Sequence, residues 1–297
     1  MAVVESHATG QAGVDVFFVI SGFIMWTVTS TETAPHVFLL RRVIRIVPLY
    51  WVATVIMAIH QKASFSAVVK SLCFIPFFGE KGVIWPVLVP GWTLNYEMFF
   101  YLLVGVTLLL PRYIQLISLI TTLCLLSFLC PVVTLSGDPI LLTYTNPIVL
   151  EFLAGILLAE SRFQSKIPGL VGGSFALIVG VAGLWFAPMD SATDIWRFVL
   201  WGAPSFLLVA GMVILEARGV MLSSAFLIFS GDASYSLYVS HTFVVMPVQR
   251  TLRAFSSSVG VVAAILTACI AGMLLYRFVE RPVTRTLRRF SDRRLAR

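Results

Sequence analysis

Residues 113–134 read YIQLISLITTLCLLSFLCPVVT, a run of 22 residues without a charged side chain. A helix needs about 20 mostly apolar residues to cross the hydrocarbon core of a bilayer. The run lacks the polar–apolar alternation of a membrane β-barrel strand, and a helix satisfies its own backbone polar groups inside lipid. This stretch therefore predicts a membrane-spanning α-helix.

The composition of the whole chain indicates the same class of protein. The 297 residues are 59% hydrophobic and only 12% charged, whereas soluble globular domains carry roughly 25% charged residues. The mean hydropathy of +0.94 also excludes a disordered chain, because disordered segments have low hydrophobicity. We therefore expect an integral membrane protein.

Eight further apolar runs have a similar character. We expect an all-α fold, a polytopic transmembrane helix bundle of about nine spans. These spans would form one integral membrane domain over residues 1–297, with a basic cytoplasmic tail at 280–297. The nine predicted spans lie near residues 13–30, 46–60, 94–110, 113–134, 147–160, 168–187, 196–216, 233–249 and 257–279.

Basic side chains are distributed unevenly along the chain. The net charge is +7, and eight arginines lie between Arg277 and the C-terminus. Such a cluster beside an apolar helix is typical of a cytoplasmic tail facing anionic lipid, and we expect no nucleic-acid partner. With this tail inside, 15 of the 21 Lys and Arg residues are cytoplasmic. The cysteines and histidines show no metal-binding spacing, so we expect no metal and no permanently bound cofactor.

Three arginines lie together in the segment HVFLLRRVIRIVPLYW, residues 36–51. On a helix, Arg41 and Arg45 share one face and Arg42 lies beside them. Arginine binds phosphate through a bidentate fork, so the cluster suits a ligand with several phosphates. Ordinary positive-inside anchoring is the alternative, and position alone favours it.

A carboxylate opens the third predicted span, in the segment PGWTLNYEMFFYLL, residues 90–103. Glu97 is the one charged residue of this segment, and a charge in a span is costly unless it is paired or faces a polar cavity. We expect it to act in the chemistry or in a structural ion pair. Trp92 and Tyr96 are candidate substrate-lining residues or members of an interfacial aromatic belt. Glu151, in a later apolar run, is a weaker candidate of the same kind as Glu97.

Two further segments hold histidines of interest. In GDASYSLYVSH, residues 231–241, Ser234 and His241 lie near the start of a predicted helix. No nucleophile motif such as GxSxG accompanies His241, so helix packing or substrate lining is the better interpretation. His7 lies in a short polar leader, where residue type and position alone do not indicate a function.

Together these segments resemble the acyltransferase 3 family of membrane acyltransferases, most closely its exopolysaccharide-production (ExoZ-like) branch. The resemblance covers nearly the whole chain and follows the family order of motifs. It rests on GVDVFFVISGFIMW (13–26), FLLRRVIRIVPLYW (38–51), VPGWTLNYEMFFY (89–101), NPIVLEFLAGILLA (146–159), GDASYSLYVSH (231–241) and FVERPVTRTLRR (278–289).

The resemblance implies a bundle of about ten helices that transfers an acyl group, often acetyl, from a coenzyme A donor to a carbohydrate hydroxyl. It implies donor-phosphate binding for the arginines at 41, 42 and 45. His7, in VVESHA, looks like the family's essential histidine, and the essential arginine that precedes it in the family would fall before Met1. Nine spans with a cytoplasmic C-terminus also place the N-terminus outside, although residues 1–12 contain no signal peptide. We therefore expect a first helix to be missing from this sequence.

The predicted activity is that of an acyltransferase for groups other than amino-acyl groups. The donor is acyl-CoA, with acetyl-CoA as the first candidate, and the acceptor is a hydroxyl of a polysaccharide or lipid-linked saccharide. His7 would be the general base or the acyl carrier, Glu97 would orient a catalytic partner, and a buried donor such as Trp92 would stabilise the oxyanion.

The resemblance also implies a multi-pass protein of the bacterial inner membrane, in contact with membrane lipid. A transporter or flippase of lipid-linked saccharide is the main alternative, although the sequence shows no duplicated halves. The second alternative is an inactive membrane partner in polysaccharide assembly.

Overall fold

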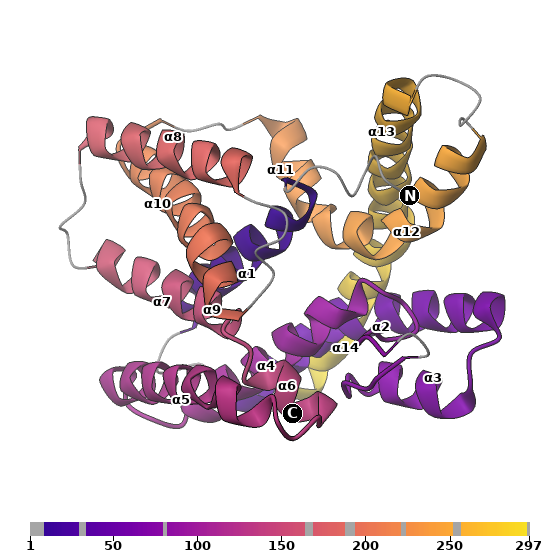
Figure 1. Cartoon of the computed structure of the whole chain (residues 1–297), viewed down its shortest axis with the longest axis horizontal. Coiled ribbons are helices and arrows are strands. Elements are labelled where there is room, and N and C mark those ends of the chain that lie inside the picture. Colours follow the sequence, from indigo (N-terminus) through magenta and orange to yellow (C-terminus); the bar gives the residue numbers. More distant parts are fainter. Residues whose placement is uncertain are drawn as a thin grey trace. The chain divides into compact units, whose positions relative to one another are not determined.

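The computed structural model describes residues 9–29, 34–79, 82–163, 169–187, 194–220, 224–251 and 257–295. Within these ranges the chain forms helices and connecting loops, with one isolated antiparallel bridge between Phe78 and Ile84. Figure 1 shows the helices coloured along the sequence. The prediction of an all-α fold is confirmed for the described residues.

Every predicted span coincides with a helix, and short helices fill several of the connections. In chain order the helices are α1 (Thr9–Val28), α2 (Pro35–Gln61), α3 (Phe65–Leu72), α4 (Gly91–Thr107), α5 (Arg112–Val133), α6 (Pro139–Tyr144), α7 (Val149–Phe163), α8 (Leu170–Phe186), α9 (Asp194–Arg197), η1 (Phe198–Gly202), α10 (Ala203–Ala217), α11 (Ala225–Asp232), α12 (Ser234–Thr251), α13 (Ser257–Leu275), η3 (Tyr276–Glu280) and α14 (Arg281–Leu295), where η marks a π-helical turn.

Two helices extend well beyond their predicted edges. Helix α2 begins at Pro35 instead of near residue 46, because proline suits the first position of a helix, where its missing N–H costs nothing. The arginine cluster therefore lies inside this helix and not at its entrance. At the other end of the chain, η3 and α14 continue α13 as far as Leu295, so the basic tail is itself helical.

Among the residues that the structure describes, four helical stretches are long and apolar enough to cross a membrane. They are Pro35–Gln61, Arg112–Val133, Phe198–Ala217 and Val259–Arg293, and two shorter apolar helices cover Ala12–Val28 and Leu170–Phe186. These apolar stretches agree with an integral membrane protein. The predicted number of about nine spans is not confirmed by this criterion and stays a prediction.

The chain divides into two compact units, each made of two sequence segments. The first unit comprises Met1–Phe38 and Tyr96–Met221, and the second comprises Leu39–Asn95 and Leu222–Arg297. Helices α2 and α4 each contribute residues to both units.

The first unit contains a very close crossing of α1 and α7. A Cβ atom added to Gly22 would lie 2.0 Å from the carbonyl oxygen of Phe152, and one added to Gly155 would lie 2.0 Å from that of Val19. Phe18 packs beside Phe152, with ring centroids 4.6 Å apart. Small residues let two membrane helices approach this closely.

The C-terminal end of α1 is capped by a cation from another helix. Arg112, the first residue of α5, donates hydrogen bonds to the carbonyl oxygens of Trp26 at 2.6 Å and Thr29 at 3.0 Å. Its guanidinium also stacks over the Trp26 ring, 3.2 Å from the centroid. A positive group is favourable there because the last carbonyls of a helix lack intrahelical partners and carry partial negative charge.

The second unit is built around α12 and α13. A Cβ atom added to Gly272 of α13 would lie 2.6 Å from the Cα atom of Leu237, so these helices also pack closely. Tyr235, at the start of α12, is buried and donates a 2.6 Å hydrogen bond to the carbonyl oxygen of Ile46. This bond ties α12 to the arginine-bearing part of α2.

Candidate functional site

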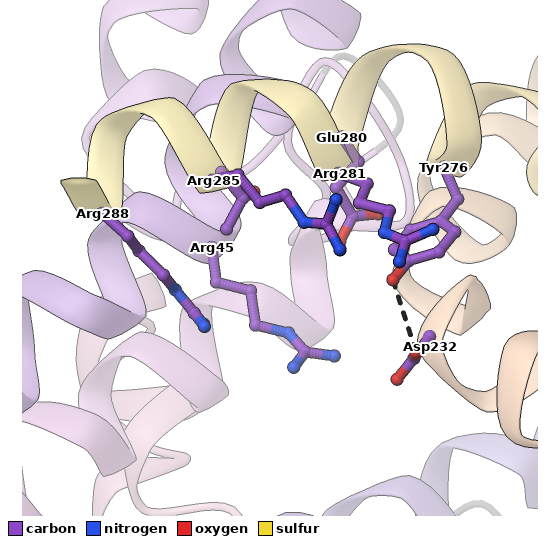
Figure 2. A pocket seen from close by; sticks show the side chains of 8 residues that line it. Arg45, Asp232, Tyr276, Glu280, Arg281, Arg285 and Arg288 are labelled. Atoms are coloured by element: carbon purple, nitrogen blue, oxygen red, sulfur yellow. Dashed lines mark hydrogen bonds between the residues drawn. The ribbon is translucent and has the colours of Figure 1, made fainter.

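The second unit contains a cavity of about 250 Å³ that is rich in arginine. Figure 2 shows Arg45 approaching it from α2, while several arginines reach it from α14. Asp232 enters from the end of α11. The cavity is lined by Arg45, Asp232, Tyr276, Glu280, Arg281, Thr284, Arg285 and Arg288.

The helical spacing of α14 explains why three of its arginines meet at one place. Arg281, Arg285 and Arg288 are separated by four and three residues, which places them on one helix face. The π-helical turn η3 directly precedes them, and such turns are frequent at functional sites. The basic tail thus presents an ordered row of guanidiniums.

Both carboxylates of the cavity have hydrogen-bond donors. Glu280 is buried, and its Oε2 accepts a 2.5 Å hydrogen bond from the hydroxyl of Ser236. The hydroxyl of Tyr276 donates to Oδ2 of Asp232 at 3.4 Å, a long bond drawn as a dashed line in Figure 2. Each carboxylate thus has a neutral hydroxyl as a hydrogen-bond donor, and Glu280 also interacts electrostatically with Arg45.

Among the described residues, none of the four guanidiniums lies at ion-pair distance from a carboxylate, although Arg45 attracts the carboxylate of Glu280. Four guanidiniums face two carboxylates, so the lining carries a formal excess of positive charge. Guanidiniums bind carboxylates and phosphates through paired N–H···O bonds. Chemically, the cavity is suited to an anion with more than one charged group.

Of the predicted arginine cluster, the structure brings Arg45 to this cavity. Arg41 is exposed and Arg42 is half-buried on the same helix, and neither lines the cavity. The prediction that all three contact one polyanion stays a prediction for Arg41 and Arg42.

The predicted residues of α12 lie outside this lining. Ser234 is exposed at the first helical position. His241 is half-buried, and its Nδ1 lies 2.6 Å from the carbonyl oxygen of Tyr238. Because a carbonyl oxygen only accepts, Nδ1 carries the proton in this contact. The residue of this segment that supports the cavity is instead Ser236, through Glu280.

Trp92 lies half-buried in the first turn of α4, beside a polar cluster of the second unit. The hydroxyl of Tyr238 donates to the carbonyl oxygen of Pro90 at 3.0 Å and lies 2.7 Å from the hydroxyl of Thr93. Thr93 donates to the same carbonyl at 3.1 Å. These bonds join the start of α4 to α12.

Glu97 and Tyr96 belong to the first unit. Glu97 is buried and accepts a hydrogen bond from the hydroxyl of Tyr101, one turn later. Tyr96 is also buried, with its ring centroid 5.8 Å from that of Phe18 and 6.5 Å from that of Tyr144. Tyr96 is therefore a core residue of this unit. Burial also raises the pKa of the neighbouring Tyr144 to about 12.

His7, the predicted catalytic histidine, lies outside the described residues. Its role stays a prediction.

The first unit contains a buried ionic group that sequence analysis did not identify. Asp15 of α1 is fully buried and pairs with Arg197 of α9 at 2.9 Å. Glu151 of α7 is also fully buried, and its carboxyl group interacts with that of Asp15 and with Arg197. Arg197 is the cation of this group.

Comparison with known proteins places the chain in a family. The sequence matches the profile of the acyltransferase domain (Acyl_transf_3) over residues 2–277, nearly its whole length. The chain belongs to the acyltransferase 3 family. It is 39% identical over 285 residues to the exopolysaccharide production protein ExoZ of Rhizobium meliloti (strain 1021), covering 90% of this chain and 86% of that protein. No solved structure matches it.

Family membership and the apolar helices together identify a membrane acyltransferase. The family match ends at residue 277, so the arginines of α14 lie beyond it. Sequence reasoning assigned those arginines to a lipid-facing tail. The signal that points to a shared site is their spacing of four and three residues, which is meaningful only once the tail is known to be helical.

Proposed function

We propose that this acyltransferase moves an acyl group, with acetyl as the first candidate, from acyl-CoA to a hydroxyl of an exopolysaccharide or of its lipid-linked precursor. The family supports the acyl transfer. The name of the Rhizobium meliloti relative, which refers to exopolysaccharide production, supports the saccharide acceptor. We place the enzyme in the bacterial inner membrane, with its C-terminus in the cytoplasm, where acyl-CoA is made.

The position of Arg45 is the observation that carries the choice of donor. Its guanidinium lies at a cavity where four positive groups face two carboxylates. Coenzyme A carries three phosphate groups at its nucleotide end, and arginine is the preferred residue for recognising phosphate. Arg41 and Arg42 lie less than two helical turns away on α2 and would meet the approaching donor.

In the proposed reaction, His7 removes the proton from the acceptor hydroxyl. The resulting oxygen nucleophile attacks the thioester carbonyl and forms a tetrahedral oxyanion, which a side-chain donor, Trp92 or Tyr96, would stabilise. When this intermediate collapses, a C–O ester bond has formed and the C–S bond breaks. The coenzyme A thiolate leaves and takes the proton from His7.

The other residues of the proposal have supporting roles. Glu97 would orient His7 or an arginine, and Ser234 and His241 would line the path of the acceptor. In an alternative sequence of steps, His7 first accepts the acyl group itself and then passes it to the hydroxyl.

The direct test is transfer of radiolabelled acetyl from acetyl-CoA to saccharide by the purified full chain in liposomes. We expect alkali-labile label on the saccharide, as an ester requires, and release of one coenzyme A thiol for each ester formed. Succinyl-CoA serves as a second donor. Movement of lipid-linked saccharide across the liposome membrane without ester formation from either donor would support a flippase instead.

A further inference from the structure

The strongest feature outside the matched family profile is the row of arginines on α14. Arg281, Arg285 and Arg288 lie beyond the family match, yet they face the same cavity as Arg45. Figure 2 shows Arg281, Arg285 and Arg288 extending from one helix toward the space that Arg45 enters from the other side.

Several like charges on one helix face repel one another. Glu280 and Asp232 offset this repulsion only in part, because two carboxylates face four guanidiniums. An anion bound in the cavity would relieve it.

We infer that α14 is the second wall of the donor site, and that Arg281, Arg285 and Arg288 bind phosphate groups of acyl-CoA together with Arg45. This inference rests on the proposed function and adds a specific set of ligand-binding residues to it. The C-terminal helix then has a role in substrate recognition in addition to any contact with lipid.

The size of the cavity identifies the part of the donor that it takes. Pockets that hold a whole small molecule measure roughly 300–1,000 Å³, and this cavity measures about 250 Å³. It is therefore too small for a complete acyl-CoA or for its whole nucleotide end, and it suits phosphate groups of that end. The pantetheine arm and the acyl group extend beyond it.

Glu280 positions this wall. Its carboxylate is held by Ser236 of α12, and Arg281 is the next residue along the chain. Because the buried bond joins α12 to the junction of η3 and α14, it determines where the row of arginines begins. Glu280 and Ser236 are therefore positioning residues for the phosphate site.

An anionic lipid headgroup offers the same phosphate chemistry, so the test must separate the two sources. Coenzyme A binding is measured by calorimetry with the full chain in phosphatidylcholine nanodiscs. Wild type is compared with Arg45→Gln, Arg285→Gln, Arg285→Lys and Arg289→Gln. Arg289 is the matched control, because it is exposed on the same helix and does not line the cavity. In parallel, the amount of phosphatidylglycerol that co-purifies with each protein is measured.

We expect Arg285→Gln to raise the Kd for coenzyme A roughly tenfold or more, as the loss of charge-assisted hydrogen bonds implies. Arg285→Lys keeps the charge but loses the planar fork, so its Kd should lie between those of the wild type and the glutamine variant. Arg289→Gln should change the Kd by less than about twofold, since Arg289 does not line the cavity. An unchanged melting temperature for Arg285→Lys shows that its weaker binding is not a folding defect.

Three results would overturn the inference. In the first, Arg285→Gln binds coenzyme A like the wild type while Arg45→Gln binds it weakly. Arg45 would then belong to the donor site, and α14 would not. Equal losses in Arg285→Gln and Arg289→Gln would show a diffuse charge effect. Loss of phosphatidylglycerol from Arg285→Gln with unchanged coenzyme A binding would make the cavity a lipid site. If neither Arg45→Gln nor Arg285→Gln affects coenzyme A binding, the proposed donor site fails as well.

Discussion

The hydroxyl of Ser236 donates a 2.5 Å hydrogen bond to the carboxylate of Glu280, and both residues are buried. The two residues are far apart in sequence and lie on α12 and η3. The bond therefore links a segment that sequence analysis associated with substrate lining to the start of the basic C-terminal helix.

Ser236→Ala should destabilise the protein, because it leaves a buried carboxylate oxygen without its donor. A loss of one such partner costs about 1–3 kcal/mol, measurable as a lower melting temperature in detergent. Glu280→Gln is the matched variant, since its amide oxygen still accepts from Ser236, and it should lose less. Equal melting temperatures for wild type and Ser236→Ala would show that this bond contributes no stability.

Gly22→Ala should loosen the crossing of α1 and α7. The added methyl group would lie 2.0 Å from a backbone oxygen of Phe152, which cannot rotate away as a side chain can. Overpacking of this kind typically costs about 1–3 kcal/mol. Gly13→Ala, on the same helix, meets nothing within 4 Å and should be neutral or slightly stabilising. Thermal unfolding of both variants tests the crossing, and similar melting temperatures for the two would contradict it.

Arg197→Gln should be strongly destabilising. It removes the partner of Asp15, which is fully buried, and a cation that interacts with the buried Glu151 as well. Breaking one side of a buried ion pair costs roughly 3–5 kcal/mol. The double variant Asp15→Asn with Arg197→Gln removes both charges and should recover part of the lost stability. If the double variant is less stable than Arg197→Gln, the two charges do not interact as the structure shows.

His7→Ala should abolish acyl transfer while coenzyme A still binds, because the proposal gives His7 the proton transfer and gives the arginines the donor. The two readouts are ester formation and calorimetric binding on the same preparation. Near-normal transfer in this variant would remove His7 from the mechanism. Rapid mixing with labelled acetyl-CoA in the absence of acceptor separates its two proposed roles, because label on the wild-type protein alone indicates an acyl carrier.

The sequence predicted the helices well because long apolar runs admit few alternatives in a membrane. Helix ends were less predictable. The run at 36–47 mixes arginines with apolar residues, so hydropathy placed the start of α2 too late, although Pro35 marks it.

The sequence predicted less of the site. Arg45 was identified from its cluster, but nothing local indicates that it shares a cavity with α14, which lies more than two hundred residues later. The pairing of Asp15 with Arg197 could not be predicted either, because the two residues lie far apart in the sequence and each is an isolated charge there. Ser236 was passed over in favour of Ser234 and His241, since only the structure shows which hydroxyl of α12 faces Glu280.

The most direct test measures kcat/KM for acetyl-CoA in saccharide acetylation by the full chain in liposomes. The variant is Arg45→Gln, and Arg289→Gln is the matched control. If Arg45 holds the donor phosphates, kcat/KM should fall roughly tenfold or more, mainly through KM, as the loss of charge-assisted hydrogen bonds implies. Arg289→Gln should resemble the wild type. Equal kcat/KM values for wild type and Arg45→Gln would contradict the donor site at this cavity.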